Sequence, residues 1–419
     1  MKNSVDLLII GAGPAGMAAA LAAAPSGASI ALIDDNPLPG GQIWRDGPQA
    51  QLPTQAQDMR TQLQRFSNIR LHSATKVIAL AGHKRLLLED PMRGWLLGYD
   101  KLILCTGARE LLLPFPGWTL PGVTGAGGLQ ALIKGGLPVS GERTVIAGSG
   151  PLLLAAAATA KKHNADIRRI AEQASLGAVS RFAASLWRWP HKAVQAVGLS
   201  SGAYRASSHV LAALGSERLE AVRLQVGSRI EEIPCELLAC GFGLVPNVEI
   251  GKALGCRVQD RAIAVDEWQA SSVTDLYAAG ECTGFGGSEL ALVEGRIAGL
   301  VVSGQQQQAR ALWPQRQHWQ GFADALNRAF ALSPALARLA APDTLVCRCE
   351  DVPYAELATQ SSWTAAKLAT RCGMGACQGR ICSTAAQTLF GWEAPTPRPP
   401  FSPARIATLA CLDETHPAT

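Results

Sequence analysis

Apolar and polar positions near the start of the chain follow the order of a strand, a turn, a helix and a second strand. Residues 5–10 are largely apolar, residues 11–16 are rich in glycine, the next segment is rich in alanine, and residues 29–33 are apolar and end at Asp34. Short apolar runs bounded by glycine predict buried strands, and a run of alanines predicts a helix. This order predicts a βαβ unit of an α/β fold.

The glycines of this unit have the spacing of a loop that binds the pyrophosphate of a dinucleotide. Gly11 would make the tight turn, Gly13 would let the backbone approach the phosphates, and Gly16 would let the helix pack closely on the strand. The helix N-terminus would present unpaired N–H groups to the phosphates, and Asp34 would accept hydrogen bonds from the ribose. The residues predicted to bind the dinucleotide here are Gly11, Gly13, Pro14, Ala15, Gly16 and Asp34.

Segments that follow this unit are expected to complete the same site. Residues 39–45 combine turn residues with polar and aromatic side chains, and they form either a surface turn or a loop along the cofactor. Two hairpin-like runs, at 76–80 and 85–89, precede a buried strand at 101–105 that ends in a Thr-Gly pair. The residues expected to contact the cofactor here are Gly41, Gln42, Arg45, Thr106 and Gly107.

The chain is predicted to return to this first domain near residue 275. Residues 275–281 form a strand-like run that ends in Gly280 and Glu281, and a helix is expected at 290–302. This ending resembles the second FAD fingerprint of the glutathione reductase and thioredoxin reductase class, in which an acid, usually Asp, binds the ribityl hydroxyls. The resemblance predicts FAD as the cofactor and adds Gly280 and Glu281 to its expected contacts.

A second unit repeats the pattern of the first. Residues 144–147 are apolar, residues 148–153 repeat the glycine loop, and after an alanine-rich segment a strand is predicted at 166–171. Leu153 stands where the third glycine is expected, so helix and strand cannot approach as closely. Candidate residues for a second nucleotide, such as NAD(P), are Gly148, Gly150 and Glu172. The alternative is a fold that is kept only for packing.

Length and composition indicate a globular protein of two or three domains. The chain has 419 residues, of which 48% are hydrophobic and 17% are charged. The predicted fold class is α/β, a flavoprotein with two dinucleotide-binding domains and a small C-terminal domain. The predicted ranges are 1–115 and 270–308 for a discontinuous FAD domain, 116–269 for the second nucleotide-binding domain, 309–342 for a helical connector and 343–419 for the C-terminal domain with its tail.

Charge and hydropathy bear on the expected partners and location. The net charge of +5 is modest and no long basic run is found, so nucleic acid is not an expected partner. No apolar run reaches membrane-spanning length, and residues 1–4 are expected to lead into the first strand without a signal peptide. The expected location is the cytoplasm, with peripheral attachment at the inner face of the membrane as an alternative.

The sequence does not reveal a substrate-oxidising site. The seven histidines are scattered singly. A Cys-x-x-Cys or Cys-x4-Cys pair that could form a redox disulfide beside the predicted flavin is found neither in the region of residues 39–45 nor in the second domain. Catalytic residues are therefore left unassigned. The second electron carrier is expected elsewhere in the chain.

A cluster of cysteines near the C-terminal end is the candidate for that carrier. In a reducing compartment such a cluster indicates metal ligation rather than disulfides. A Cys-x-Cys pair followed by Cys-x4-Cys differs from the two Cys-x2-Cys knuckles of zinc ribbons, so a 2Fe-2S cluster is favoured over structural zinc. The predicted ligands are Cys347, Cys349, Cys377 and Cys382, and Cys372 is the predicted spare thiol.

Residues 347–352 and 370–382 resemble the bacterioferritin-associated-ferredoxin-like domain of the α subunits of heteromeric, dye-linked amino acid dehydrogenases. That group includes D-hydroxyproline dehydrogenase, the opine oxidases, dye-linked L-proline dehydrogenase and hydrogen cyanide synthase. Residues 39–45 and 148–154 resemble the same group, so the resemblance spans nearly the whole chain. It implies that a separate flavin-bearing β subunit oxidises the substrate, and that the second nucleotide domain holds ATP in some members.

These observations predict an electron-transfer α subunit that contains FAD and a 2Fe-2S cluster. The implied partners are the flavin-containing β subunit, a small γ subunit, and a quinone or other electron acceptor. The implied substrate is an amino or imino acid such as hydroxyproline, an opine, proline or glycine. Two rival hypotheses are a self-contained NAD(P)H-dependent reductase and a non-catalytic scaffold that binds zinc.

Overall fold

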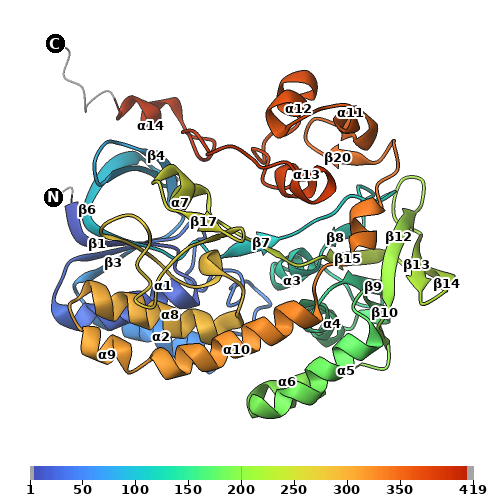
Figure 1. Cartoon of the computed structure of the whole chain (residues 1–419), viewed down its shortest axis with the longest axis horizontal. Coiled ribbons are helices and arrows are strands. Elements are labelled where there is room, and N and C mark those ends of the chain that lie inside the picture. The colour runs from blue at the N-terminus through green and yellow to red at the C-terminus, as the bar shows by residue number, and fades with distance from the viewer. Residues whose placement is uncertain (1–3, 200, 413–419) are drawn as a thin grey trace.

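The computed structural model describes residues 4–199 and 201–412. Figure 1 shows two α/β units beside each other, with a small helical domain next to the second unit and one long helix, α10, that reaches from the first unit to the second. Residues 1–3, 200 and 413–419 of the predicted domain ranges lie outside the described residues.

The first unit is built on a seven-stranded sheet in the order β3-β2-β1-β6-β5-β4, with β19 paired to β6. Strands β3, β2, β1, β6 and β19 are parallel, whereas β5 and β4 form an antiparallel hairpin at the edge. Ligands of open parallel sheets bind outside the carboxyl ends of the strands. The strands are β1 (Ser4–Ile10), β2 (Ile30–Ile33), β3 (Ile69–His72), β4 (Lys76–Leu80), β5 (Arg85–Glu89), β6 (Gly94–Leu104) and β19 (Leu276–Ala278).

Two helices from opposite ends of this unit pack closely against each other. These are α1 (Pro14–Ala23), whose alanines are mostly buried, and α8 (Gly287–Val302). A Cβ added to Gly295 would lie 2.1 Å from the carbonyl oxygen of Ala15, and one added to Gly299 would lie 2.2 Å from that of Ala19. The two glycines therefore set the distance between the helices. Other helices of this unit are η1 (Ala24–Ser26) and α2 (Thr54–Arg65).

The second unit has a five-stranded parallel sheet in the order β11-β10-β9-β15-β8. Its strands are β8 (Val123–Gly125), β9 (Arg143–Gly148), β10 (Asp166–Glu172), β11 (Tyr204–Arg205) and β15 (Leu237–Gly241). An antiparallel sheet adds β12 (Ser208–Leu214), β13 (Ala221–Val226) and β14 (Arg229–Pro234). Its helices are α3 (Ala126–Lys134), α4 (Leu152–Lys162), α5 (Leu176–Ser185), η2 (Leu186–Arg188) and α6 (Pro190–Gly198).

A two-stranded ribbon and several short elements join the units. Strand β7 (Ala108–Glu110) leaves the first unit and pairs with β16 (Leu244–Pro246), which returns to it. The return then passes through α7 (Glu249–Ala253), β17 (Val258–Gln259), β18 (Ala262–Ile263) and, after β19, η3 (Glu281–Thr283). The chain thus inserts the second unit between two halves of the first.

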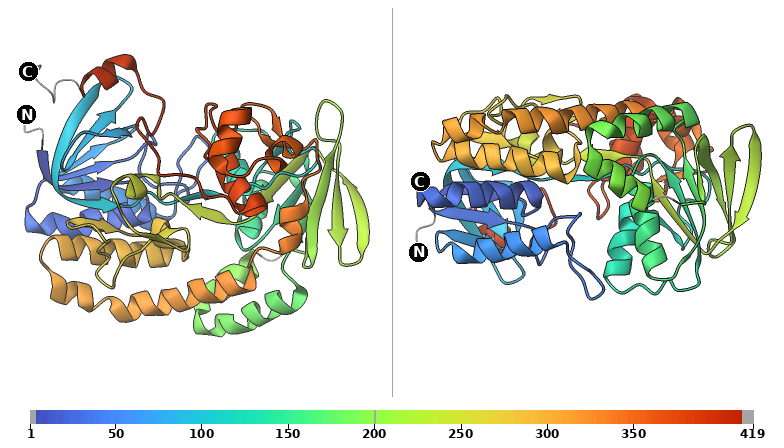
Figure 2. Two further views of the ribbon diagram at one scale, coloured as in Figure 1. Left: turned by 45° about the horizontal axis from the view of Figure 1, so that its top comes forward. Right: turned by 90° about the horizontal axis from the view of Figure 1, so that it is seen from below.

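The connector consists of α9 (Gln306–Arg310), α10 (Trp313–Ala329) and η4 (Pro334–Arg338). Both views in Figure 2 show α10 running from the helices of the first unit toward α5 and α6 of the second. The small domain that follows, here the cysteine domain, contains β20 (Leu345–Cys347), β21 (Val352–Pro353), α11 (Tyr354–Ala358), α12 (Trp363–Thr370) and α13 (Cys382–Phe390). Trp118 of the second unit donates a 2.6 Å hydrogen bond to the Leu345 carbonyl, so the cysteine domain rests on that unit.

The final described segment, residues 393–412, leaves the cysteine domain and returns to the first unit. Phe401 donates a 2.8 Å backbone hydrogen bond to Ile78, and Arg405 contacts Glu89 with both its backbone and its side chain. This segment ends in α14 (Ile406–Ala410), which lies over the β4–β5–β6 hairpins in Figure 1. We call residues 393–412 the C-terminal strap.

Predicted elements agree with the observed ones where the pattern is local. The runs predicted at 76–80 and 85–89 coincide with β4 and β5, and the second βαβ unit is present at 143–172. The helix predicted at 290–302 begins earlier, at Gly287. Within the described part of the chain, every helix is too short or too polar to cross a membrane.

Replacing Gly295 with Ala tests the α1–α8 contact. The added Cβ must displace the backbone of Ala15, and overpacking of this kind costs about 1–3 kcal/mol. We expect a lower midpoint of thermal unfolding. Gly177→Ala is the matched control, because the space around that helical glycine is open. A midpoint for Gly295→Ala that equals the control would contradict the contact.

Candidate functional site

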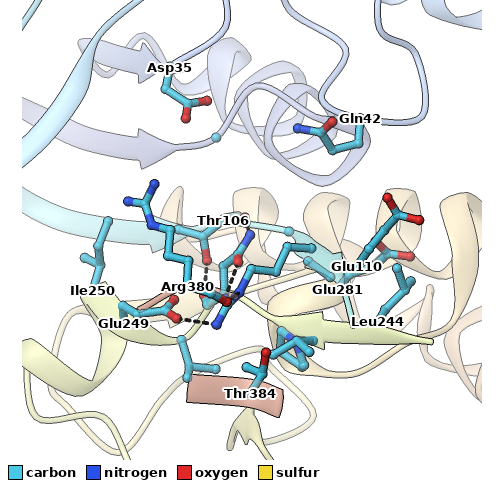
Figure 3. Close-up of a pocket in the computed structure, with 18 of the residues that line it drawn as sticks. Asp35, Gln42, Thr106, Glu110, Leu244, Glu249, Ile250, Glu281, Arg380 and Thr384 are labelled. Atoms are coloured by element: carbon cyan, nitrogen blue, oxygen red, sulfur yellow. Dashed lines mark hydrogen bonds and ion pairs between the residues drawn. The ribbon is translucent and has the colours of Figure 1, made fainter. Parts of the chain in front are cut away.

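A cleft of about 1620 Å³ lies at the carboxyl ends of the parallel strands of the first unit. Its walls come from the first unit, from α3 and α4 of the second unit, from the cysteine domain and from the C-terminal strap. Figure 3 shows Asp35 and Gln42 on one wall and Thr384 of α13 on the opposite wall. The cleft exceeds the ≈300–1,000 Å³ typical of a single small-molecule pocket.

The first glycine loop forms one end of this cleft. Gly13 is the N-cap of α1, with φ −74°, and a Cβ added there would meet only the Cα of Gly41, at 3.8 Å. Gly11 and Gly16 have no such freedom, because a Cβ on either would collide with backbone oxygens. The contacts of Gly11 and Gly16 agree with the tight turn and the close helix packing expected from their spacing, whereas the phosphate contact of Gly13 stays a prediction.

The loop at residues 39–45 lies along the first glycine loop rather than apart from it. Gly40 donates a 2.8 Å hydrogen bond to the Ala12 carbonyl, and Gly41, Gln42 and Arg45 line the cleft. Arg45 donates to the Gln42 side chain through one nitrogen, while its buried Nε has no partner among the described residues. The loop therefore forms part of the cleft wall, and its contact with a cofactor stays a prediction.

Asp34 lies at the end of β2, where its carboxylate holds the glycine loop in place. It is only 6% exposed, accepts a 2.6 Å hydrogen bond from the Ala12 N–H and accepts two more from Asn36. Burial raises its pKa, and these hydrogen bonds oppose the rise. Asp35, which the sequence analysis missed, is exposed and points into the cleft (Figure 3). A ribose at this end could therefore meet either carboxylate.

Glu281 brings an unpartnered carboxylate to the same cleft. Its pKa is raised by burial, and among the described residues no group donates a hydrogen bond to its side chain. The residues on either side of Glu281 in sequence are held by Glu294 of α8, which is 4% exposed and accepts hydrogen bonds from the Gly280 N–H, at 3.0 Å, and the Thr283 hydroxyl, at 3.2 Å. Arg316 of α10 lies 3.6 Å from the Glu294 carboxylate. The sequence analysis missed this support, since both residues lie inside helices without a motif.

Thr106 and Gly107 line the cleft beside a polar network that reaches the cysteine domain. Thr106 and Asn247 exchange two hydrogen bonds, of 2.6 and 2.8 Å. Arg109 donates to the Asn247 side chain, pairs with Glu249 at 2.8 Å and donates a 3.1 Å hydrogen bond to the Arg380 carbonyl (Figure 3). Arg380 belongs to residues 371–381, which join α12 to α13 and are here called the cysteine loop. This network therefore joins the end of β6 directly to the cysteine loop.

Glu110 occupies the N-terminus of α3 at the cleft wall. It accepts hydrogen bonds of 2.7 and 2.9 Å from the N–H groups of Gly127 and Gly128. Burial raises its pKa, and the two N–H groups oppose the rise. The helix terminus is thereby satisfied by the chain's own carboxylate, which removes it as a free anion site.

The second glycine loop stands outside the cleft. Of the residues that line the cleft, Leu152 and Ala155 belong to α4, but the candidate nucleotide-binding residues do not line it. Those candidates are Gly148, Gly150 and Glu172. Glu172 is fully buried, and burial raises its pKa to about 7.

The cysteine domain carries five cysteines, which form a group of three and a pair. Cys347, Cys372 and Cys382 are buried, and their sulfurs lie within 4.8 Å of one another. Cys349 is exposed and interacts with the backbone and the thiol of Cys377. Contacts with the Cys372 and Cys382 thiols hold the pKa of Cys347 far below its usual value. The predicted spare, Cys372, thus lies among the predicted ligands rather than apart from them.

Comparisons with known proteins place these features in a family. The family model described as pyridine nucleotide-disulphide oxidoreductase matches residues 5–307. One subunit of the opine oxidase of Agrobacterium tumefaciens (strain Ach5) is 31% identical over 474 aligned residues, which cover 99% of this chain and 93% of the relative. The HcnB subunit of the hydrogen cyanide synthase of Pseudomonas protegens is 31% identical over 428 aligned residues, which cover 90% of each protein.

A solved structure extends the likeness in fold to the whole chain. The crystal structure of L-proline dehydrogenase from P. horikoshii matches with a TM-score of 0.68 and 19% sequence identity, and the match covers 97% of this chain and 79% of that chain. The fold class predicted for the two nucleotide-binding units is confirmed by the family match and the observed topology. A 2Fe-2S cluster in the cysteine domain stays a prediction.

Replacing Gly13 with Val tests the cofactor end of the cleft. The backbone at Gly13 is compatible with a side chain and has room for it, so the fold should survive while the Val side chain fills the place of the pyrophosphate. We expect FAD to be retained about tenfold more weakly, or about 1.4 kcal/mol. The measurement is the flavin content of the purified protein, with Gly198→Val in α6 as the control. Full flavin content in Gly13→Val would contradict the assignment.

Proposed function

The chain belongs to the pyridine nucleotide-disulphide oxidoreductase family and to the group that contains HcnB and its opine oxidase counterpart, and on this premise we propose that it is the electron-transfer subunit of a heteromeric amino or imino acid dehydrogenase. It is an oxidoreductase. In the proposal it holds FAD and a 2Fe-2S cluster, and a partner flavin subunit oxidises the carbon next to the nitrogen of the substrate.

One observation carries this proposal: a single cleft is lined both by the first glycine loop and by the cysteine loop. Gly13 and Glu281 line it from the first unit, and Met374, Gln378 and Arg380 line it from the cysteine domain. Electron carriers must lie close together to exchange electrons, and this cleft would hold one at each wall. The hydrogen bond from Arg109 to the Arg380 carbonyl fixes the two walls relative to each other.

The residues around the glycine loop fit FAD. Gly13 leaves open space at the N-terminus of α1 for the pyrophosphate, and the unpartnered carboxylate of Glu281 can accept hydrogen bonds from the ribityl hydroxyls. Arg45 adds a half-buried cationic side chain whose Nε lacks a partner among the described residues. When bound, FAD accepts electrons in pairs and can pass them on singly. The chain's part is to hold the cofactor in one orientation and to exclude water from it.

The cysteine group fits a 2Fe-2S cluster in its donor set. Four thiolates hold such a cluster, and the domain offers three sulfurs within 4.8 Å of one another and a neighbouring Cys349–Cys377 pair. Our proposed ligands remain Cys347, Cys349, Cys377 and Cys382. Arg348, Arg371 and Arg380 are the nearby cations that would moderate the negative charge of the cluster. Structural zinc is the rival, because three buried thiols within 4.8 Å also suit a tetrahedral ion.

A partner subunit is proposed to oxidise the substrate. Both relatives described above are named as subunits, one of an opine oxidase and one of hydrogen cyanide synthase. Of the described histidines, none lines the cleft, so the commonest general base is missing from it. The acceptor is proposed to be a quinone or a similar carrier, a γ subunit is part of the expected complex, and the expected location is the cytoplasm or the inner face of the membrane.

A self-contained NAD(P)H-dependent reductase is the second candidate. It is favoured by the family match, which includes pyridine nucleotide in its description and extends through the second unit. It would require a nicotinamide to reach the flavin from the second glycine loop, although residues 148–150 do not line the cleft.

Anaerobic mixing with nicotinamide nucleotides distinguishes the two functions. A hydride passes only when the nicotinamide stacks against the flavin, so we expect excess NADH or NADPH to leave the flavin of the isolated chain oxidised for many minutes. The assembled complex should bleach when the correct amino or imino acid is added. The measurement is the flavin absorbance. Rapid bleaching of the isolated chain would support the NAD(P)H-dependent reductase instead.

Substitution of single cysteines tests the ligand set. We expect Cys377→Ser to abolish the visible absorbance of the cluster and the iron content, because a lost thiolate leaves one iron without a ligand, and we expect Cys372→Ser to retain both. The opposite result would make Cys372 a ligand. Stoichiometric zinc and no absorbance beyond that of flavin in the unaltered chain would favour the zinc scaffold.

A further inference from the structure

The second glycine loop is covered by a segment of its own chain. Residues 330–333 connect α10 to η4 and cross the loop at residues 148–150. The Ser149 hydroxyl donates a 2.9 Å hydrogen bond to the Phe330 carbonyl. Gln173, directly after β10, donates 2.9 Å hydrogen bonds to the Ala331 carbonyl and to the Ser149 hydroxyl, and it accepts a 3.0 Å hydrogen bond from the Ser333 N–H.

Phe330 lies at the open face of Gly150. A Cβ added to Gly150 would meet the Phe330 side chain at 3.7–3.8 Å, whereas one added to the corresponding Gly13 would meet only the Cα of Gly41. The Phe330 ring also contacts the Phe182 ring edge-on, with the ring centroids 5.2 Å apart. An aromatic side chain therefore lies against the second glycine of this loop.

Glu172 is turned inward and is not offered to a ribose. Its carboxylate accepts hydrogen bonds from the Gly150 N–H at 2.7 Å and from the Ala174 N–H at 2.8 Å, and the residue is fully buried. The carboxylate thus closes the loop from inside, while the connector covers it from outside.

The connector is anchored at both ends. Leu336 of η4 is buried in the core of the second unit, with Leu332 and Leu339 packed against that core. On the other side, Trp319 and Phe322 of α10 share a buried cluster with Trp189 of the second unit and Leu290 of the first. A nucleotide could reach Gly150 only after this segment had left the loop.

We infer that the second glycine loop is an intramolecular docking site whose ligand is residues 330–333, and that it takes this polypeptide segment in place of a nucleotide. The loop's hydrogen-bonding groups and its open glycine face are used to fix the connector that leads into the cysteine domain. The second unit then acts as the platform that sets where the cysteine domain stands. This inference concerns the second unit alone and does not depend on the proposed function.

Hydrogen–deuterium exchange of the holoprotein tests the inference in two arms. In the first, excess NADH, NADPH or ATP is added separately, and the amides of residues 148–153 and 330–339 are followed. We expect none of the three to change their exchange. Saturable protection at 148–153, or faster exchange at 330–339 caused by a nucleotide, would overturn the inference. A nucleotide that binds without changing the exchange of either segment binds at another site, and that result supports the inference.

In the second arm, Gln173→Leu removes the side-chain hydrogen bonds to the connector while keeping the volume of the residue. We expect exchange at residues 330–339 to rise about tenfold, the effect of losing roughly 1.4 kcal/mol of local stability. Gln225→Leu in β13, which loses similar bonds to backbone carbonyls, is the matched control. If Gln173→Leu does not fold, Ser149→Ala is measured in its place. Exchange at the level of the control would show that these contacts do not hold the connector.

Discussion

The close approach of α1 and α8 is the contact on which the candidate site depends. The two helices come from opposite ends of the first unit, and they meet because Gly295 and Gly299 leave room for the carbonyl groups of Ala15 and Ala19. Gly280 lies against Ala15 for the same reason, since a Cβ there would come within 2.8 Å of the Ala15 side chain. The end of the cleft at the first glycine loop and the end at Gly280 and Glu281 are therefore held by one interface, although the whole second unit is inserted between them in sequence.

The two glycine loops share one hydrogen-bonding arrangement but differ in what lies against them. In both, a carboxylate 22 residues downstream accepts a hydrogen bond from a loop N–H, from Ala12 in the first unit and from Gly150 in the second. The first loop opens on a large cleft, and the second is closed by Phe330. The loops differ in their backbone, since Gly13 has φ −74° and Gly150 has φ +88°, and also in their surroundings, which come from residues distant in sequence.

The sequence predicted the parts of the fold whose signal is local. The βαβ units, the hairpin strands and the return at Gly280 follow from runs of apolar residues and from turn residues, which act over a few positions. Glu294 and Arg109 were not found, because each acts through contacts with other elements of the fold, and Asp35 was not found, because the adjacent Asp34 already stood at the position expected for the ribose. The pairing of Glu294 with Arg316 lies within two helices of ordinary composition. Only the Gly295-x-x-x-Gly299 spacing in α8 offered a signal that could have been used for the α1–α8 contact.

The C-terminal strap also decides how the first unit meets water. Ile78, Ala79 and Leu87 form a small apolar cluster on the β4–β5 hairpin, and Ala404, Leu409 and Leu412 of the strap cover it. This hairpin is the edge of the seven-stranded sheet, and an uncovered apolar edge is a template for pairing with other chains. A fragment that ends after the cysteine domain would expose this apolar cluster to solvent. The same segment that forms one wall of the cleft therefore also keeps an apolar sheet edge out of water.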